Sequence, residues 1–99
     1  MSYFAVVIHD VDDQERYGQE YIPGAMELIN KHGGAVVGLA PQLTKVEGEP
    51  SAQTGVIIAF PTEDAFKAWY DDPDYAPLRE LRHSITSTRT MVGVPEFSM

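Results

Sequence analysis

The sequence predicts an α+β domain with the element order β-α-β-β-α-β, the arrangement called ferredoxin-like. Two observations carry this prediction. Four short runs rich in β-branched and aromatic residues are typical of strands, and two stretches with apolar residues three or four apart are typical of helices. The 99 residues are enough for one such fold, so we expect a single domain over 1–99 with a C-terminal tail at 95–99.

The first half of the chain predicts a strand, a helix and a second strand. Residues 3–9 (YFAVVIH) contain no breaker and predict the first strand. From residue 12 to residue 32 apolar residues recur at helical spacing, and Pro23 should kink or interrupt that helix. The glycines at 33–34 suit a left-handed helix cap, after which residues 35–39 (AVVGL) predict the second strand.

The second half predicts a further strand, a helix in two parts and a last strand. Residues 40–54 fit either a continued strand or a loop, and residues 55–60 (GVIIAF) predict the third strand. Helical spacing returns over residues 62–85, and Pro73 should begin the second helical part. Residues 87–94 (STRTMVGV) predict the fourth strand.

The charge of the chain excludes several classes of partner. Fifteen acidic residues against seven scattered Lys and Arg residues give a formal net charge of −8. Nucleic acids and anionic membrane surfaces attract basic patches, so we expect neither as a partner. No apolar run approaches the roughly 20 residues that span a bilayer, and the N-terminus has no signal-peptide pattern, so we expect a cytoplasmic protein.

No residue pattern in the sequence indicates a metal site or a cofactor site. The three histidines are far apart, and the acidic cluster at 10–13 does not have the spacing of a calcium loop. No glycine-rich phosphate loop follows a strand, and the chain has no cysteine. We therefore expect no metal and no cofactor, which leaves a small organic molecule or a second copy of the chain as the partner.

The predicted strands are apolar on both faces. In the first strand Phe4, Val6 and Ile8 alternate with Tyr3, Ala5 and Val7. Two helices can cover only one face of a sheet, and a large apolar face is rarely left exposed. We therefore expect a second copy, placed face to face by a two-fold axis, to cover the other face. The alternative is that residues 41–54 fold over it.

Several segments together resemble one uncharacterised bacterial family, catalogued as domain of unknown function 1330. They are the helix entry with Tyr17 and Tyr21, HGG at 32–34, VEGE at 46–49, and FPTEDAFKAWYDDPDYAPLRELR at 60–82. The resemblance covers nearly the whole chain. It implies the dimeric α/β-barrel superfamily, in which two ferredoxin-like chains join their sheets into a barrel, and it implies no particular reaction.

Three residues of the second half are candidate ligand-binding residues. Arg82 lies beside the apolar stripe of the last helix, four residues after Leu78, where its guanidinium can bind the carboxylate of a small organic acid. An ion pair with Glu80, Asp74 or another acid is the alternative. Trp69 and Tyr75 can form the apolar walls of such a pocket or simply pack in the core.

Two histidines are candidates for proton transfer, and the catalytic residues otherwise stay unknown. His9 shares a strand face with Tyr3 and Val7, which we assign to the barrel or dimer face, and its ordinary pKa suits a general base. A hydrogen bond to a neighbouring strand is the alternative role. His32 ends the first helix, where capping is the simpler role.

The function predicted from these features is a homodimeric protein that binds a small aromatic or carboxylic molecule. The first alternative is a cofactor-free monooxygenase or isomerase, as found among relatives in the superfamily. The second is a stress-associated module without catalysis. Fold-level analogy cannot choose among them.

Overall fold

Four strands form one antiparallel sheet in the computed structural model, which describes residues 2–48 and 52–98. The sheet order is β2-β3-β1-β4, with β1 at Tyr3–Val11, β2 at Ala35–Ala40, β3 at Thr54–Phe60 and β4 at Thr86–Pro95. The strand β1 lies in the interior of the sheet and pairs with β3 on one side and β4 on the other. Together with the helices this is the β-α-β-β-α-β ferredoxin-like fold that the sequence predicts.

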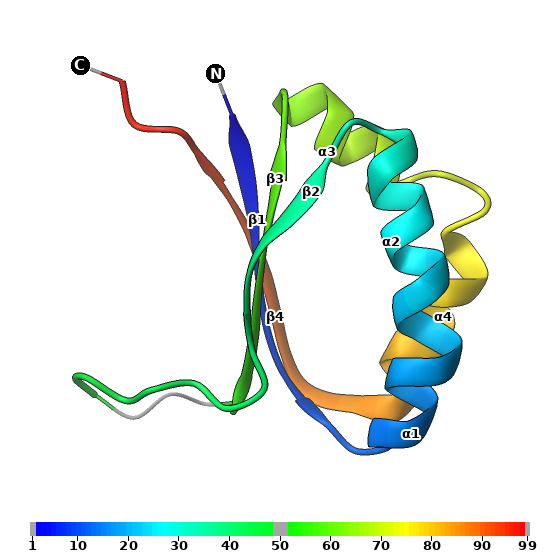
Figure 1. The fold of residues 1–99 in the computed structure, drawn as a ribbon, viewed down its shortest axis with the longest axis vertical. Helices are drawn as coiled ribbons and strands as arrows, with labels where there is room; N and C mark the ends of the chain where they lie inside the picture. The colour runs from blue at the N-terminus through cyan, green and yellow to red at the C-terminus, as the bar shows by residue number, and fades with distance from the viewer. Residues whose placement is uncertain (1, 49–51, 99) are drawn as a thin grey trace.

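The first helical stretch is continuous but changes type along its length (Figure 1). It consists of α1 (Gln14–Arg16), the π-helix η1 (Tyr17–Tyr21) and α2 (Ile22–Lys31). Pro23 lies in the first turn of α2, where a missing backbone donor is tolerated, so the helix changes its hydrogen bonding instead of breaking. Gly33 ends the stretch with a φ of +78°, as predicted.

The second helical stretch has two parts, α3 (Glu63–Tyr70) and α4 (Ala76–Ile85). The side chain of Thr62 caps α3 by accepting a hydrogen bond from the backbone of Ala65. The predicted start of the second part at Pro73 is wrong, because α4 begins three residues later. The carboxylate of Asp72 instead accepts the backbone N–H of Asp74 and shapes the turn between the helices.

All helices lie on one side of the sheet (Figure 1). The core fills the space between the two layers; its buried apolar residues are Ala5, Val7, Tyr17, Tyr21, Ala25, Ile29, Ile58, Phe60, Trp69, Tyr75 and Ile85. The layers approach closely where α2 leads into β2, because a Cβ on Gly34 would lie 2.8 Å from the ring of Phe60. None of the described helices has the length and apolar character needed to cross a membrane.

The face of the sheet away from the helices is apolar, as the alternation predicts. Ile57, Val92 and Val94 keep 40%, 47% and 45% of their surface exposed there. The described part of the segment between β2 and β3 is a loop that extends away from the sheet on this side (Figure 1). Its Leu43 covers Gly55, while the rest of the predicted strand-or-loop segment includes residues 49–51, which are outside the described residues.

Candidate functional site

A cavity of about 200 Å³ lies between the helices and the covered face of the sheet. Its walls are mostly apolar and come from α2 and all four strands, with further residues from η1, α3 and α4. Met26 and Leu39, which are 37% and 62% exposed, mark its mouth between α2 and the edge strand β2. The polar side chains on the lining are His9, Tyr17, Tyr21, Trp69 and Arg82.

Arg82 supplies the positive charge of this cavity. Helix α4 holds it with only 3% of its surface exposed, and the hydroxyl of Thr86 donates to its backbone carbonyl oxygen. Among the described residues no carboxylate oxygen lies within 4.0 Å of its nitrogen atoms. Burial lowers the pKa of Arg82, but the phenols of Tyr75 and Tyr21 outweigh that effect and raise it, so the guanidinium stays charged.

Two tyrosines join the helical stretches beside this arginine. The hydroxyl oxygens of Tyr21 and Tyr75 are 2.7 Å apart and share a hydrogen bond. Burial raises the pKa of Tyr21 well above its ordinary value, so it remains a neutral phenol. Tyr75 is fully buried, and its ring centroid lies 4.4 Å from that of Trp69. The buried hydrogen bond between these two phenols therefore connects the π-helix to the turn between α3 and α4.

His9 is held on the opposite wall by Tyr17. Its Nε2 lies 3.0 Å from the Tyr17 hydroxyl, and the two rings meet edge to face. The imidazole is 1% exposed, and its burial together with the charge of Arg82 lowers the pKa of His9 to about 4. Burial raises the pKa of Tyr17 to about 12. Both groups are therefore neutral at neutral pH.

Three buried nitrogen atoms, all in residues that line the cavity, have no hydrogen-bond partner. They are Nδ1 of His9, Nε1 of Trp69 and Nε of Arg82, and no other buried side-chain nitrogen or oxygen of the described residues lacks one. Buried polar groups in folded proteins nearly always have partners, because an unsatisfied one is costly. Their concentration around one cavity marks this cavity as the candidate functional site.

The model of the family Domain of unknown function (DUF1330) matches residues 2–96. The chain belongs to this family. The predicted family resemblance is thus confirmed, and the match extends over both helical stretches and all four strands of the sheet. No curated protein sequence matches the chain.

Solved structures similar to this DUF1330 chain share its fold at low sequence identity. A protein of unknown function from Rhodopseudomonas palustris, RPA0582, has a TM-score of 0.79 at 14% identity, covering 99% of this chain and 84% of that one. SnoaB, a cofactor-independent oxygenase from Streptomyces nogalater, has a TM-score of 0.66 at 14% identity, covering 99% and 95%. A dimeric ferredoxin-like protein of unknown function from Thermobifida fusca has a TM-score of 0.55 at 16% identity, covering 97% and 92%.

The fold of this DUF1330 chain brings some of the predicted site residues together. Trp69, Arg82 and His9 all line the cavity, and Tyr75 packs against Trp69 directly behind the lining. The assignment of His9 to the dimer face is wrong, since its strand face is the one that the helices cover. Alternation in the sequence groups residues by face but does not say which face meets the helices.

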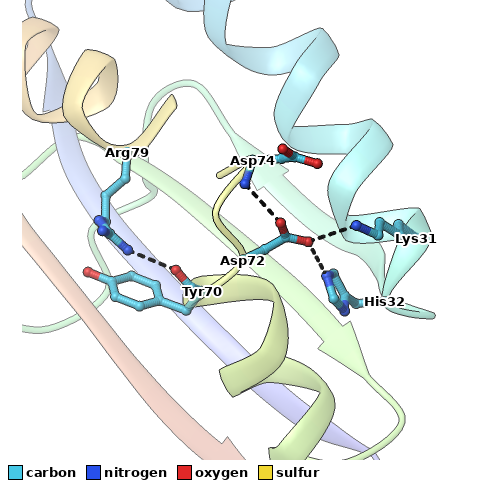
Figure 2. Close-up of polar contacts among 6 residues, drawn as sticks. All are labelled: Lys31, His32, Tyr70, Asp72, Asp74 and Arg79. Carbon is cyan, nitrogen blue, oxygen red and sulfur yellow. Dashed lines mark hydrogen bonds and ion pairs between the residues drawn. The ribbon is translucent and has the colours of Figure 1, made fainter. Parts of the chain in front are cut away.

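His32, the other candidate for proton transfer, is not among the residues that line the cavity. It points to the carboxylate of Asp72 instead (Figure 2). Its Nε2 donates to an Asp72 carboxylate oxygen 2.8 Å away, and Lys31 donates to the same oxygen from 3.1 Å. The other oxygen accepts the backbone N–H of Asp74. These contacts, from His32 above all, hold the pKa of Asp72 well below its usual range. The cluster ties the end of α2 to the turn between α3 and α4.

Sequence reasoning missed Tyr17 and Tyr21 as polar members of the site. Their spacing predicts only that they lie on the apolar face of a helix, and they form part of the family resemblance. The available signal was two phenols four residues apart on a face that packs inward, because a buried tyrosine hydroxyl needs a partner. In the described ranges no cluster of three or more His, Cys, Asp or Glu side chains is arranged to hold a metal ion.

Proposed function

We propose that this protein binds a small aromatic or carboxylic molecule in the cavity of each chain and functions as a homodimeric α/β barrel. One observation carries the binding proposal: the buried guanidinium of Arg82 adjoins an apolar cavity and has no carboxylate beside it among the described residues. Burying a charge is unfavourable unless it is paired. A ligand carboxylate supplies the missing partner in fork geometry.

Thermal unfolding in the presence of small carboxylates tests the binding proposal. A ligand that binds the folded state raises Tm as its concentration passes its Kd. The probes are benzoate, which is aromatic, and hexanoate, which is aliphatic. At least one of them should raise the Tm of the wild type, and R82M should abolish the rise. K67Q is the matched control, because Lys67 is an exposed cation paired with Glu63 on α3. An equal response in R82M, or no response to either probe in the wild type, contradicts the proposal.

The homodimer proposal is supported by the outer face of the sheet. Ile57, Val92 and Val94 form an apolar surface there, and similar structures such as the Thermobifida fusca protein are described as dimeric. Light scattering should give a mass of about twice 11.0 kDa. The substitution V92K should shift the mass to that of one chain, whereas E80K, on the exposed side of α4, should not. A wild-type mass of 11.0 kDa at all concentrations contradicts the proposal.

A second candidate function is a cofactor-free oxygenase or isomerase, and His9 is the observation that favours it. In the tautomer that donates from Nε2 to the Tyr17 oxygen, the unpartnered Nδ1 is a neutral base in a residue that lines the cavity. Such a base takes a proton from a bound ligand and returns it at another position. Exchange of ligand hydrogen for deuterium in D₂O, followed by NMR, should occur with the wild type and be lost in H9Q. Equal exchange in both proteins contradicts this role.

A further inference from the structure

The volume of the cavity limits its ligand to about one ring. A dry protein cavity of about 150 Å³ binds benzene. The cavity here is about 200 Å³, which leaves room for one six-membered ring with small substituents and not for two fused rings. Aromatic side chains are also part of its wall: the rings of Tyr17 and Tyr21 are stacked with their centroids 5.3 Å apart, and Trp69 adjoins the same space. Such surfaces favour a planar aromatic partner.

The charge of the lining limits the ligand to one anionic group. Arg82 is the one lining residue among those described that carries a charge at neutral pH, since His9 is neutral there. A second negative charge would be buried against aliphatic walls without a partner, which is strongly unfavourable. A monocarboxylate therefore fits the lining, and a dicarboxylate or a phosphate dianion does not.

The unpartnered nitrogens specify the remaining polar groups. Arg82 Nε and Trp69 Nε1 can only donate, so they require acceptors, and both side chains adjoin Tyr75. The two oxygens of one carboxylate supply such acceptors. His9 is instead held by Tyr17, and its Nδ1 donates or accepts according to the tautomer. A ligand hydroxyl satisfies His9 in either case, because a hydroxyl both donates and accepts.

We propose that the cavity binds a single-ring aromatic monocarboxylate that carries a hydroxyl group, with the carboxylate on Arg82 and Trp69 and the hydroxyl on His9. This inference rests on the proposed function, because it specifies the ligand class of the same site. Hydroxybenzoates are the simplest members of the class.

Isothermal titration of the full-length protein at pH 7.5 tests the ligand class. The probes are 3-hydroxybenzoate and 4-hydroxybenzoate, compared with benzoate, cyclohexanecarboxylate, phthalate, 1-naphthoate and 4-hydroxybenzyl alcohol. At least one hydroxybenzoate should bind one per chain and about tenfold or more tightly than any of the others, since one well-made hydrogen bond or ion pair is worth about that factor. A crystal structure of that complex should place the carboxylate at Arg82.

Two variants separate a binding role from a structural one. R82M should lose hydroxybenzoate binding, with R82K restoring part of it. H9L should lose the preference for hydroxybenzoate over benzoate, a ratio of two Kd values that a merely structural role would not change. Circular dichroism establishes that each variant is folded, and Y17F provides a milder change at the same wall if H9L unfolds.

The outcomes distinguish failure of the ligand class from failure of the proposed function. Tighter binding of phthalate, naphthoate or cyclohexanecarboxylate, dependent on Arg82, overturns the hydroxybenzoate class and leaves the anion-binding function standing. A preference for hydroxybenzoate that survives in H9L overturns the role of His9. Absence of binding by every carboxylate, with only ordered water in the cavity of the crystal, overturns both proposals.

Discussion

Two polar clusters in this molecule are built from similar residues and differ in how completely those residues are paired. Around Asp72, a lysine, a histidine and a backbone N–H satisfy one carboxylate (Figure 2). Around Arg82, a buried cation and a buried histidine each keep an unpartnered nitrogen. The saturated cluster holds two segments of the chain together. The unsaturated cluster retains hydrogen-bonding capacity, which is what a binding site requires.

The two clusters also differ in solvation. The side chain of Lys31 is 56% exposed, whereas Arg82 is 3% exposed. Water therefore weakens the ion pair of Lys31 with Asp72, although the Asp72 side chain is only 6% exposed, and weakens few of the interactions at Arg82. Removing the central charged side chain should consequently have opposite effects on the stability of the fold in the two clusters.

The largest difference is expected from removing the central charge of each cluster, beginning with R82M. Replacing a buried, incompletely paired cation by an apolar side chain of similar length is often neutral or stabilising, so the free energy of unfolding without ligand should rise by about 1 kcal/mol or stay unchanged. Urea denaturation measures it. A loss of more than about 2 kcal/mol would mean that Arg82 is a structural residue.

The substitution D72A should have the opposite effect. It leaves His32, Lys31 and the backbone of Asp74 without their shared acceptor, so Tm should fall by about 5 °C or more while ligand binding is unchanged. Thermal unfolding followed by circular dichroism measures the fall. D71A is the matched control, because Asp71 is exposed next to the same turn and should change Tm little. Equal effects of the two substitutions would contradict the stated role of Asp72.

The two clusters should contribute to the pH dependence of stability in different pH ranges. The folded pKa of His9, about 4, is below its ordinary value of 6.5, so the unfolded state binds the proton first and stability should fall as the pH drops from 6.5 to about 4. The pKa of Asp72 is also depressed, so its contribution is present above its ordinary value of 3.8 and is lost as the pH falls further. Tm measured against pH for the wild type, H9L and D72A tests this. A decline between pH 6.5 and 4 that persists unchanged in H9L would contradict the assignment to His9.

The smallest expected effect concerns the phenol pair that supports the cavity. Y21F removes the 2.7 Å hydrogen bond to Tyr75 and should lower the free energy of unfolding by about 1 kcal/mol. Urea denaturation is again the measurement. Y70F removes a hydroxyl of a partly buried tyrosine that makes no such bond and should change stability less. If the two variants are equal, the phenol pair contributes nothing to stability.

The sequence was sufficient for the fold because its signals are local. Runs of β-branched residues and apolar spacing of three or four predict the strands and helices, and Gly33 takes the left-handed cap that its position indicates. The prediction failed at Pro73 because the carboxylate of Asp72 bonds residues about 40 positions away as well as its own turn. Local capping rules do not include such distant partners.

The site was less accessible from sequence for a related reason. Residue type was enough to select Arg82 and Trp69. That no carboxylate of the described residues lies beside Arg82 depends instead on where the fold places each acid. The covered face of β1, which decides whether His9 points to the cavity, depends on the packing of helices against the sheet. The π-helical turn that carries Tyr17 and Tyr21 has no residue signature of its own.

The position of Leu39 has a consequence for the rate at which molecules enter and leave. This side chain borders both the mouth of the cavity and a hollow on the outer face of the sheet. A molecule that fills this hollow would therefore contact Leu39 at the mouth of the cavity and could restrict the opening. Assembly would then slow both entry and escape of the bound compound, and by reciprocity any change in its affinity on assembly would appear as an equal change in the strength of assembly.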